Sequence, residues 1–253
     1  MASSERSKQA TEAAGAARTL LRAVVDASGL SRRKAFAAIR EGRVAMDGAV
    51  CKEPSQPYAD GALTLDGSVL AAAAVTKVYL LLNKPPGFMT TRSDERGRRT
   101  VFDLVPQSLR ATGLHSVGRL DRDTSGLLLL TNDGDLTFAL THPRHEVEKE
   151  YWLQLESPAT DEQLAALRSG VHLDGALRRP LRLRRLVGSG RFELSMTIRE
   201  GRRRQIRRMV EAVGGKVTQL RRVREGSLEL GSLPEGAVRG LTEAEVEGLR
   251  GGG

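Results

Sequence analysis

The chain has 253 residues, with 40 Lys and Arg against 31 Asp and Glu, which gives a formal net charge of +9. A field of that sign favours polyanionic partners such as nucleic acid and disfavours basic ones. Aromatic residues make up 4% of the chain, which argues against a large stacking surface. The single cysteine excludes an internal disulfide and any multi-cysteine zinc site. No apolar run approaches the ~20 residues of a membrane helix and no signal peptide is recognisable, so we expect a cytoplasmic protein.

The N-terminal region is predicted to be a disordered tail followed by a small folded domain. Residues 1 to 16 carry no large apolar side chain after the first methionine, so they cannot offset their ordering entropy by burial. Residues 17 to 42 show two short helical patterns, the second capped by Ser31 and ended by a glycine. Residues 43 to 50 alternate around an Asp-Gly turn, as a hairpin does. Residues 71 to 76 are small and are predicted to be a linker.

Basic side chains crowd the second helical pattern and the turn after it. A run of charge is usually a solvated face, but one concentrated on a single helix of a small domain in a basic protein favours phosphate contacts. The residues concerned are Arg32, Arg33, Lys34, Arg40 and Arg43.

Four consecutive leucines in the middle of the chain predict a buried strand. Leu127–Leu130 lie between Gly126 and an Asn-Asp-Gly turn. The acidic, hydroxylated segment before them is then a loop held by that strand, which is a common place for catalytic side chains. Two carboxylates compete there, those of Asp121 and Asp123. We interpret Asp123, together with Thr124, as a turn cap, because such side chains commonly bind nearby backbone.

Apolar spacing and turn signals predict the remaining elements. Residues 78 to 82 form a strand that must end before two prolines. Residues 136 to 142 fit a short helix, and residues 146 to 152 begin another strand. A capping-box pattern at 160 to 163 begins a helix. The apolar residues between 206 and 213 recur at helical spacing, so one helix face is core while arginines project from the others.

Two further patterns bear on chemistry. Tyr151 begins a strand and would in an unfamiliar sequence be a half-buried core residue. The four histidines show no metal-ligand spacing, and the glycines form neither a dinucleotide fingerprint nor a phosphate-binding loop. No metal and no cofactor are therefore expected.

The string from Gly118 to Gly126 closely resembles the Gly-Arg-Leu-Asp motif of pseudouridine synthases, in the branch named for RsuA and RluB. In that family the aspartate of the motif is catalytic, and Asp121 matches it. Lys149 and Tyr151 match the family's Lys-x-Tyr motif, whose tyrosine lies against the target base. The stretch from Glu200 to Met209 is similar to the Glu-Gly-Arg-x-Arg-Gln-x-Arg-Arg-Met signature almost without change.

The resemblance implies roles for individual side chains. Asp121, Tyr151 and Arg207 are the expected catalytic residues, with Arg207 in an ion pair that keeps the Asp121 carboxylate charged. A phenol ring stacks on a base, and its hydroxyl can also hydrogen-bond or move a proton. Leu220 and Arg222 match the last motif, in which the leucine packs beside the base and the arginine supports the site. The residues expected to contact RNA or the base in this domain are Arg119, Leu120, Lys149, Arg202, Arg204, Leu220 and Arg222.

The N-terminal region resembles the S4-like RNA-binding domain. Its hallmark is Ser-Arg-Arg, followed by Gly-Arg-Val and a short Asp-Gly turn, and all three occur between Ser31 and Gly48. This resemblance implies RNA contacts by Arg32, Arg33, Lys34 and Arg43.

We therefore expect an α+β protein with a small S4-like N-terminal domain and a catalytic domain built on a mixed, mainly antiparallel sheet. The expected segments are a disordered tail at 1–16, an S4-like domain at 17–70, a linker at 71–76, a catalytic domain at 77–240 and a C-terminal tail at 241–253.

The expected activity is the isomerisation of uridine to pseudouridine in ribosomal RNA, by a monomer that needs no cofactor and binds no membrane. Residues 93 to 103 look similar to the RluB-type members, which favours large-subunit RNA. The alternatives are a uridine of small-subunit RNA and a non-catalytic RNA-binding protein of ribosome assembly.

Overall fold

The computed structural model describes residues 18–70, 76–110 and 112–251. The boundary between two compact units falls between Thr76 and Lys77, and each unit is described by itself. The expected disordered tail and all but the last residue of the expected linker lie outside the described residues. No helix within the described ranges is long and apolar enough to cross a membrane.

The first unit consists of two helices and a four-stranded antiparallel sheet with the order β2-β1-β3-β4. The hydroxyls of Thr19 and Ser31 accept hydrogen bonds from backbone amides in the first turns of the helices, which is why the helices begin there. The predicted helices and hairpin are confirmed. Membership of the S4-like family stays a prediction. The elements are α2 (Leu20–Ser28), α3 (Arg32–Arg40), β1 (Val44–Met46), β2 (Ala49–Cys51), β3 (Leu63–Leu65) and β4 (Ser68–Val69).

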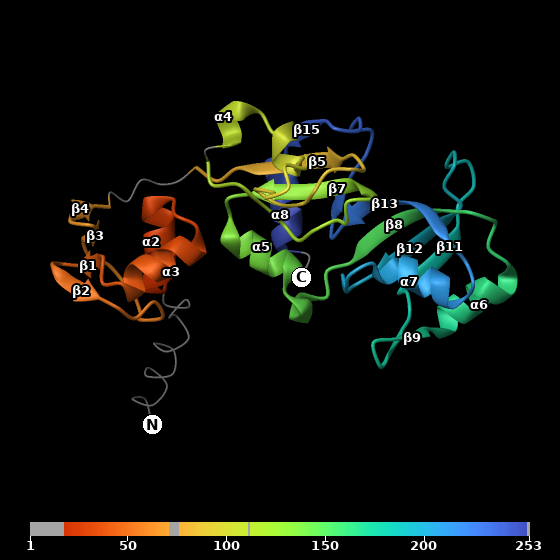
Figure 1. Ribbon diagram of the computed structural model, residues 1–253, viewed down its shortest axis with the longest axis horizontal. Helices are drawn as coiled ribbons and strands as arrows, with labels where there is room; N and C mark the ends of the chain where they lie inside the picture. The colour runs from red at the N-terminus through yellow and green to blue at the C-terminus, as the bar shows by residue number, and fades with distance from the viewer. Residues whose placement is uncertain (1–17, 71–75, 111, 252–253) are drawn as a thin grey trace, which may run out of the picture. The chain divides into compact units, whose positions relative to one another are not determined.

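The second unit is built on a large mixed sheet with the order β11-β12-β8-β13-β7-β5-β15, to which β14 and β6 add at β13 and β7. The pair of β7 and β13 is parallel and every other pair in the sheet is antiparallel, so the expected α+β fold is confirmed (Figure 1). The strands are β5 (Tyr79–Lys84), β6 (His115–Ser116), β7 (Thr124–Thr131), β8 (Lys149–Leu155), β11 (Arg182–Arg185), β12 (Leu194–Ile198), β13 (Val217–Glu225), β14 (Leu228–Glu229) and β15 (Val238–Gly240).

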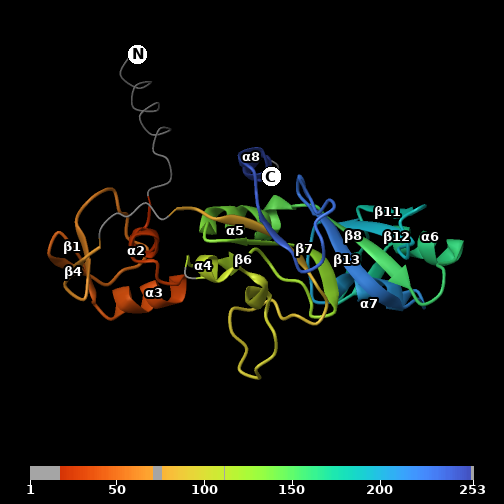
Figure 2. The same ribbon diagram turned by 90° about the horizontal axis from the view of Figure 1, so that it is seen from above.

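The leucine run forms the centre of β7 and is covered on both faces, as predicted. Leu127 and Leu129 pack with the helices α5 (Gly134–Thr141) and α8 (Glu243–Gly251). Leu128 and Leu130 pack in the larger core, under the segment that contains η1 (Val101–Leu104) and α4 (Gln107–Arg110). Figure 2 shows the loop before η1, in yellow, extending away from the sheet. Burial on both faces holds β7 rigidly, because each leucine contributes roughly 1.5–3 kcal/mol.

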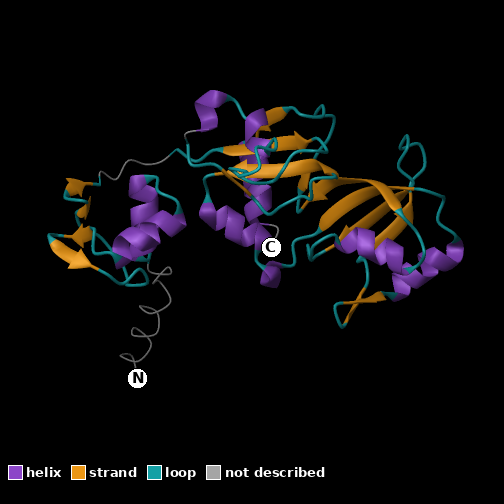
Figure 3. Cartoon of the chain, in the orientation of Figure 1, coloured by secondary structure: helices purple, strands orange, loops and turns teal. Residues whose placement is uncertain are grey.

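Two helices and a small ribbon cover the half of the sheet that contains β8, β11 and β12 (Figure 3). The capping box is confirmed, because Thr160 and Gln163 exchange side-chain to backbone hydrogen bonds. The predicted apolar face of the last of these helices is buried in the larger core. The elements are α6 (Asp161–Ser169), β9 (Val171–Leu173), β10 (Ala176–Arg178) and α7 (Gln205–Ala212), and η2 (Pro143–His145) precedes β8.

The C-terminal segment is folded, and the expectation of a tail from residue 241 was wrong for α8. Val246 and Leu249 are buried in the second unit. Arg250 also forms an ion pair with Asp133, 3.1 Å away. The sequence concealed the helix because its apolar positions are few and lie among glycines and charges.

A side chain at Gly126 would collide with the neighbouring strand. Gly126 lies opposite Arg222 in the parallel pair of β7 and β13. An ideal Cβ there would lie 2.2 Å from the Arg222 carbonyl oxygen, and the φ of +100° disfavours any residue with a side chain.

We expect Gly126→Ala to lower the free energy of unfolding by about 2–6 kcal/mol, because the overlap and the positive φ each cost roughly 1–3 kcal/mol. Thermal unfolding followed by circular dichroism measures the loss. Gly240→Ala is the matched control, because a Cβ at that position meets nothing within 4 Å. Equal melting temperatures for the two variants would contradict the expected collision.

Candidate active site

A buried lysine holds the loop that carries Asp121. The Lys84 ammonium donates hydrogen bonds to the carbonyl oxygens of Pro85, Arg122 and Thr124, at 3.0, 3.3 and 2.8 Å. Lys84 is fully buried at the end of β5, next to the start of β7. Because three carbonyl groups converge on one cation, the loop backbone is fixed before any substrate binds.

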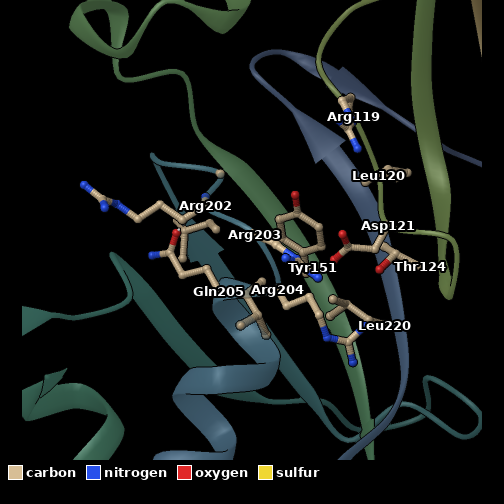
Figure 4. A pocket seen from close by; sticks show the side chains of 13 residues that line it. Arg119, Leu120, Asp121, Thr124, Tyr151, Arg202, Arg203, Arg204, Gln205 and Leu220 are labelled. Carbon is tan, nitrogen blue, oxygen red and sulfur yellow. Dashed lines mark hydrogen bonds between the residues drawn. The ribbon is translucent and has the colours of Figure 1, made fainter. Parts of the chain in front are cut away.

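Asp121 and Tyr151 line the same cavity, of about 290 Å³. This volume is near the lower end of the roughly 300–1,000 Å³ of small-molecule sites, so the cavity suits a ligand of nucleobase size. Figure 4 shows the Asp121 carboxylate beside the Tyr151 ring, with Leu220 next to them. The predicted residues that the structure brings together here are Arg119, Leu120, Asp121, Tyr151, Arg202, Arg204 and Leu220.

The ion pair expected between Arg207 and Asp121 is wrong. Arg207 lies 3.3 Å from a carboxylate oxygen of Asp123, and it donates hydrogen bonds to the carbonyl oxygens of Asp123 and Val217, at 3.1 and 2.8 Å. The turn closed by the Thr124 amide and the Asp121 carbonyl places Asp123 toward α7. Among the described residues, no side chain forms an ion pair or hydrogen bond with the Asp121 carboxylate.

Asp123 is an ion-pair partner and not the simple turn cap that we expected. Arg204 lies 3.0 Å from its carboxylate, in addition to Arg207. Burial alone would raise the pKa of Asp123, but the hydrogen bond from Arg204 and the charges of both arginines outweigh it and hold that pKa below its ordinary value. Asp123 therefore stays charged and ties the loop that carries Asp121 to α7.

Tyr151 lies in front of a buried group of charged residues on β8 and β13. It is opposite Arg222 in the sheet register, and Lys149 is opposite Glu225. Arg222 and Glu225 are 2% and 0% exposed and lie 3.2 Å apart. The Arg222 Nε also donates to the Leu127 carbonyl oxygen at 2.8 Å, which joins β13 to β7.

The burial of these groups changes their acid-base properties. Burial raises the pKa of Tyr151, although the positive charge of Arg222 opposes the rise, so the phenol remains protonated at neutral pH. Burial lowers the pKa of Lys149, which the charge of Glu225 opposes. The Lys149 ammonium lies 3.8 Å from Glu225 and donates to the Val147 carbonyl oxygen at 3.0 Å.

Several expected RNA contacts are therefore directed into the protein. Arg222 and Lys149 bind protein groups behind the cavity, and both also line a neighbouring groove, so their role as RNA contacts stays a prediction. Arg207 lies behind the cavity as well. The predicted contacts Arg32, Arg33, Lys34 and Arg43 belong to the first unit.

Sequence reasoning missed Glu225, whereas a structural role of Lys84 in supporting the loop was expected and agrees with its three hydrogen bonds. The signal for Glu225 is its position at the end of a strand-like stretch that also contains Leu220 and Arg222. An acid that is buried in such a strand needs a cation as its partner. The partner is set by strand register, which the sequence does not show. Among the described residues, no group of three or more His, Cys, Asp or Glu side chains is arranged to hold a metal ion.

The fold and this site define an enzyme of the class that rearranges nucleosides in RNA, and comparison with known proteins agrees. The family described as RNA pseudouridylate synthase matches residues 78–212. The chain belongs to this family.

Two relatives and one solved structure similar to the chain are named as pseudouridine synthases. A Bacillus subtilis (strain 168) protein named ribosomal large subunit pseudouridine synthase B is 37% identical, over 91% of this chain and 95% of that protein. A Vibrio cholerae protein of the same name is 39% identical, over 87% of this chain and 70% of that protein. A crystal structure of a pseudouridylate synthase superposes with a TM-score of 0.65 at 34% identity, over 91% of this chain and 99% of that one.

The buried lysine gives the site an expected pH dependence. Burial lowers the pKa of Lys84 to about 8, although the charges of Asp123 and Asp121 oppose the shift. Above that pH the amine loses a proton, so one of its three carbonyl bonds and the positive charge beneath the loop are lost. We expect turnover at saturating RNA to fall as the pH rises through about 8.

Pseudouridine formation in short reactions between about pH 7 and about pH 9.5 measures this fall, because that range spans the pKa of the buried lysine. Lys84→Met is the matched variant, because its side chain has a similar length and cannot titrate. We expect it to be slower at pH 7 and to lack the alkaline decrease. The same alkaline profile in both proteins would assign the decrease to another group.

Proposed function

We propose that the protein converts a uridine of large-subunit ribosomal RNA into pseudouridine, with Asp121 as the essential group. The observation that carries this proposal is that Asp121, Tyr151 and Leu220 meet in one cavity of nucleobase size bordered by arginines. The names of the Bacillus subtilis and Vibrio cholerae relatives support the large-subunit target.

The chemistry requires a group that acts at the sugar or at the departing base. The bond between N1 of uracil and the sugar breaks, the base turns, and C5 bonds to the same sugar carbon. C5 then loses a proton and N1 gains one. Asp121 acts either as a nucleophile on the nucleoside or by assisting the departure of the base, and both routes need the charged carboxylate in the cavity. The reaction is an isomerisation, so no redox partner or activated donor is required.

Tyr151 holds the detached uracil in this proposal. Its ring borders the cavity beside Asp121, where it can stack on the base. Because burial keeps its hydroxyl protonated, the group that faces the base is a phenol, which can donate or accept a hydrogen bond. The ring alone, or the ring and the hydroxyl together, serves the reaction.

The first unit is proposed to bind RNA beside the target, as an S4-like domain at residues 17–70. Helix α3 supports this, since Arg32, Arg33 and Lys34 are exposed along it. Arg43 is the weakest of the proposed contacts, because it forms ion pairs with Asp66 and Glu41. We further propose that the enzyme acts in the cytoplasm, as a monomer and without a cofactor.

A non-catalytic RNA-binding protein of ribosome assembly would need the basic surface but not the cavity. The Asp121 carboxylate has no ionic or hydrogen-bonding partner among the described residues, and it borders an open cavity. A carboxylate with a structural role would be paired, because an unpaired charge that is partly removed from water destabilises the fold. This observation favours the enzyme, either on large-subunit RNA or, as the second candidate target, on small-subunit RNA.

Asp121→Asn is expected to abolish activity, by about 10³-fold or more, because it keeps the shape of the side chain and removes its charge. RNA affinity should stay within several-fold, since the phosphate contacts are unchanged. Pseudouridines are mapped by carbodiimide derivatisation and primer extension in ribosomal RNA from cells that lack the gene and from cells supplied with each variant.

The matched control is Asp161→Asn on α6, whose side chain is 91% exposed and lies outside the cavity. We expect it to restore the missing pseudouridine as the unaltered protein does. Restoration by Asp121→Asn would refute the assignment of the essential group. Loss of a small-subunit site, with the large-subunit sites intact, would revise the target and leave the enzyme class in place.

Tyr151→Phe separates the two roles of the tyrosine. If the ring alone acts, turnover is retained; if the hydroxyl moves the C5 proton, the reaction stops after the base has detached. Because burial keeps the phenol protonated, it cannot take the C5 proton directly; it can give its own proton to N1 and then, as the phenolate, take the proton from C5. We therefore expect the second result, with turnover reduced by about 10²-fold or more. Single-turnover measurement of pseudouridine, together with recovery of RNA that carries a detached base, tells the cases apart. Tyr151→Ala at full activity would exclude both roles.

A further inference from the structure

A second groove adjoins the active-site cavity. It has a volume of about 1,090 Å³ and shares Arg119, Tyr151 and Arg202 with the cavity, so a chain that leaves the cavity enters the groove directly. The arginines that line it are Arg119, Arg168, Arg178, Arg179, Arg199, Arg202 and Arg222, of which Arg202 and Arg222 are paired with Glu200 and Glu225.

Part of this positive charge is available to a ligand. Arg178 and Arg199 are paired with acids of the protein, Glu200 and Glu146, at 3.1 and 3.0 Å. Within the part of the chain that the structure describes, Arg119, Arg168 and Arg179 form no ion pair. Free guanidinium groups along a groove suit the phosphates of a nucleic acid strand.

An aromatic cluster lies at the rim of this groove, where α5 ends. The Phe138 ring is 46% exposed, although the apolar residues around it in α5, Leu136 and Leu140, are buried. Its centre lies 4.7 Å from that of His142, which lines the groove, and 5.6 Å from that of His145. The Arg144 guanidinium lies over the Phe138 ring, 5.0 Å from its centre.

Hydrogen bonds fix the histidine rings. The Arg144 amide donates to Nδ1 of His142 at 3.3 Å, which places the proton of a neutral ring on Nε2. The Arg144 Nε donates to Nε2 of His145 at 3.0 Å, and Nδ1 of that ring bonds to the Ala139 carbonyl oxygen at 2.7 Å. The rings are therefore held in place without a ligand, and ordering them on binding costs little entropy.

We propose that Phe138 and His142 form a stacking subsite for an unpaired base of the substrate RNA, outside the target uridine, whose backbone follows the arginine-lined groove. This inference rests on the proposed function, because it takes the substrate RNA as the ligand. Unpaired bases stack on exposed aromatic rings and guanidinium planes, and both are present here. The free arginines favour a polyanion over a protein segment as the occupant.

The first test places a fluorescent ring in the subsite. The chain has a single tryptophan, Trp152, so Phe138→Trp in a Trp152→Phe background carries one reporter. Stacking on a base quenches indole emission. We expect quenching when unmodified large-subunit RNA is added to saturation, as judged by filter binding. Unchanged emission with bound RNA would overturn the subsite.

The second test separates stacking from general apolar contact. Phe138→Leu keeps an apolar side chain without a ring, and Phe138→Tyr keeps the ring. Stacking predicts that Phe138→Leu raises KM for RNA by about 10-fold, while Phe138→Tyr raises it much less. Val187→Ala is the control, because Val187 is an apolar residue that is 96% exposed and lies outside the active-site cavity and the groove.

Each outcome decides between defined alternatives. A KM for Phe138→Leu equal to that of the unaltered protein would overturn stacking. Binding of a protein from assembling ribosomes that is lost in Phe138→Leu, with RNA affinity unchanged, would overturn RNA as the occupant. If the unaltered protein makes no pseudouridine, the proposed function fails, while filter-binding affinities of the same variants still decide the subsite.

Discussion

The close approach of two parallel strands at Gly126 and Arg222 is the constraint on which the catalytic geometry depends. On β13 this pairing runs from Leu220 to Arg222. The loop that carries Asp121 enters β7 directly before the pairing, while Tyr151 faces Arg222 from β8 on the other side of β13. The carboxylate, the leucine and the phenol ring thus come from three neighbouring strands. A side chain in place of the glycine would separate β7 from β13, and with them the carboxylate from the ring.

The two carboxylates of the catalytic loop have different surroundings because the turn between them directs them to different places. Asp123 meets Arg204 and Arg207 from α7, so its charge is used to hold the loop. Lys84 binds only backbone carbonyl groups of that region. The loop is therefore fixed by contacts that leave Asp121 without a protein partner among the described residues, so the carboxylate keeps its hydrogen-bonding capacity toward the cavity. Preorganisation of this kind lowers the cost of reaching the reactive geometry.

Local sequence patterns predicted the helices and strands. They did not predict side-chain partners that depend on strand register or on the direction of a turn. The leucines of β7 and the capping box of α6 are encoded by neighbouring residues, so both were predicted correctly. The partner of Arg207 could not be, since it depends on how the turn directs Asp123 relative to Asp121. Arg222 was expected beside the RNA because nothing in its own segment shows that β7 and β8 bury it from both sides. Family motifs identify which residues matter, but they do not give the direction in which each side chain points.

The buried charges of Arg222 and Glu225 behind Tyr151 lower the stability of the sheet, and their position next to the phenol suggests that they act on it. A buried ion pair gains less than its desolvation costs unless its geometry is excellent, and apolar residues such as the leucines of β7 would fill the same space at lower cost. Arg222 lies between Glu225 and Tyr151, so its positive charge acts on the phenol from behind the cavity. Burial raises the pKa of the phenol, which keeps the hydroxyl protonated, and the charge of Arg222 limits that rise. A leucine in place of the arginine would suit the sheet better, and it would leave the Tyr151 hydroxyl without the positive charge that limits the rise of its pKa.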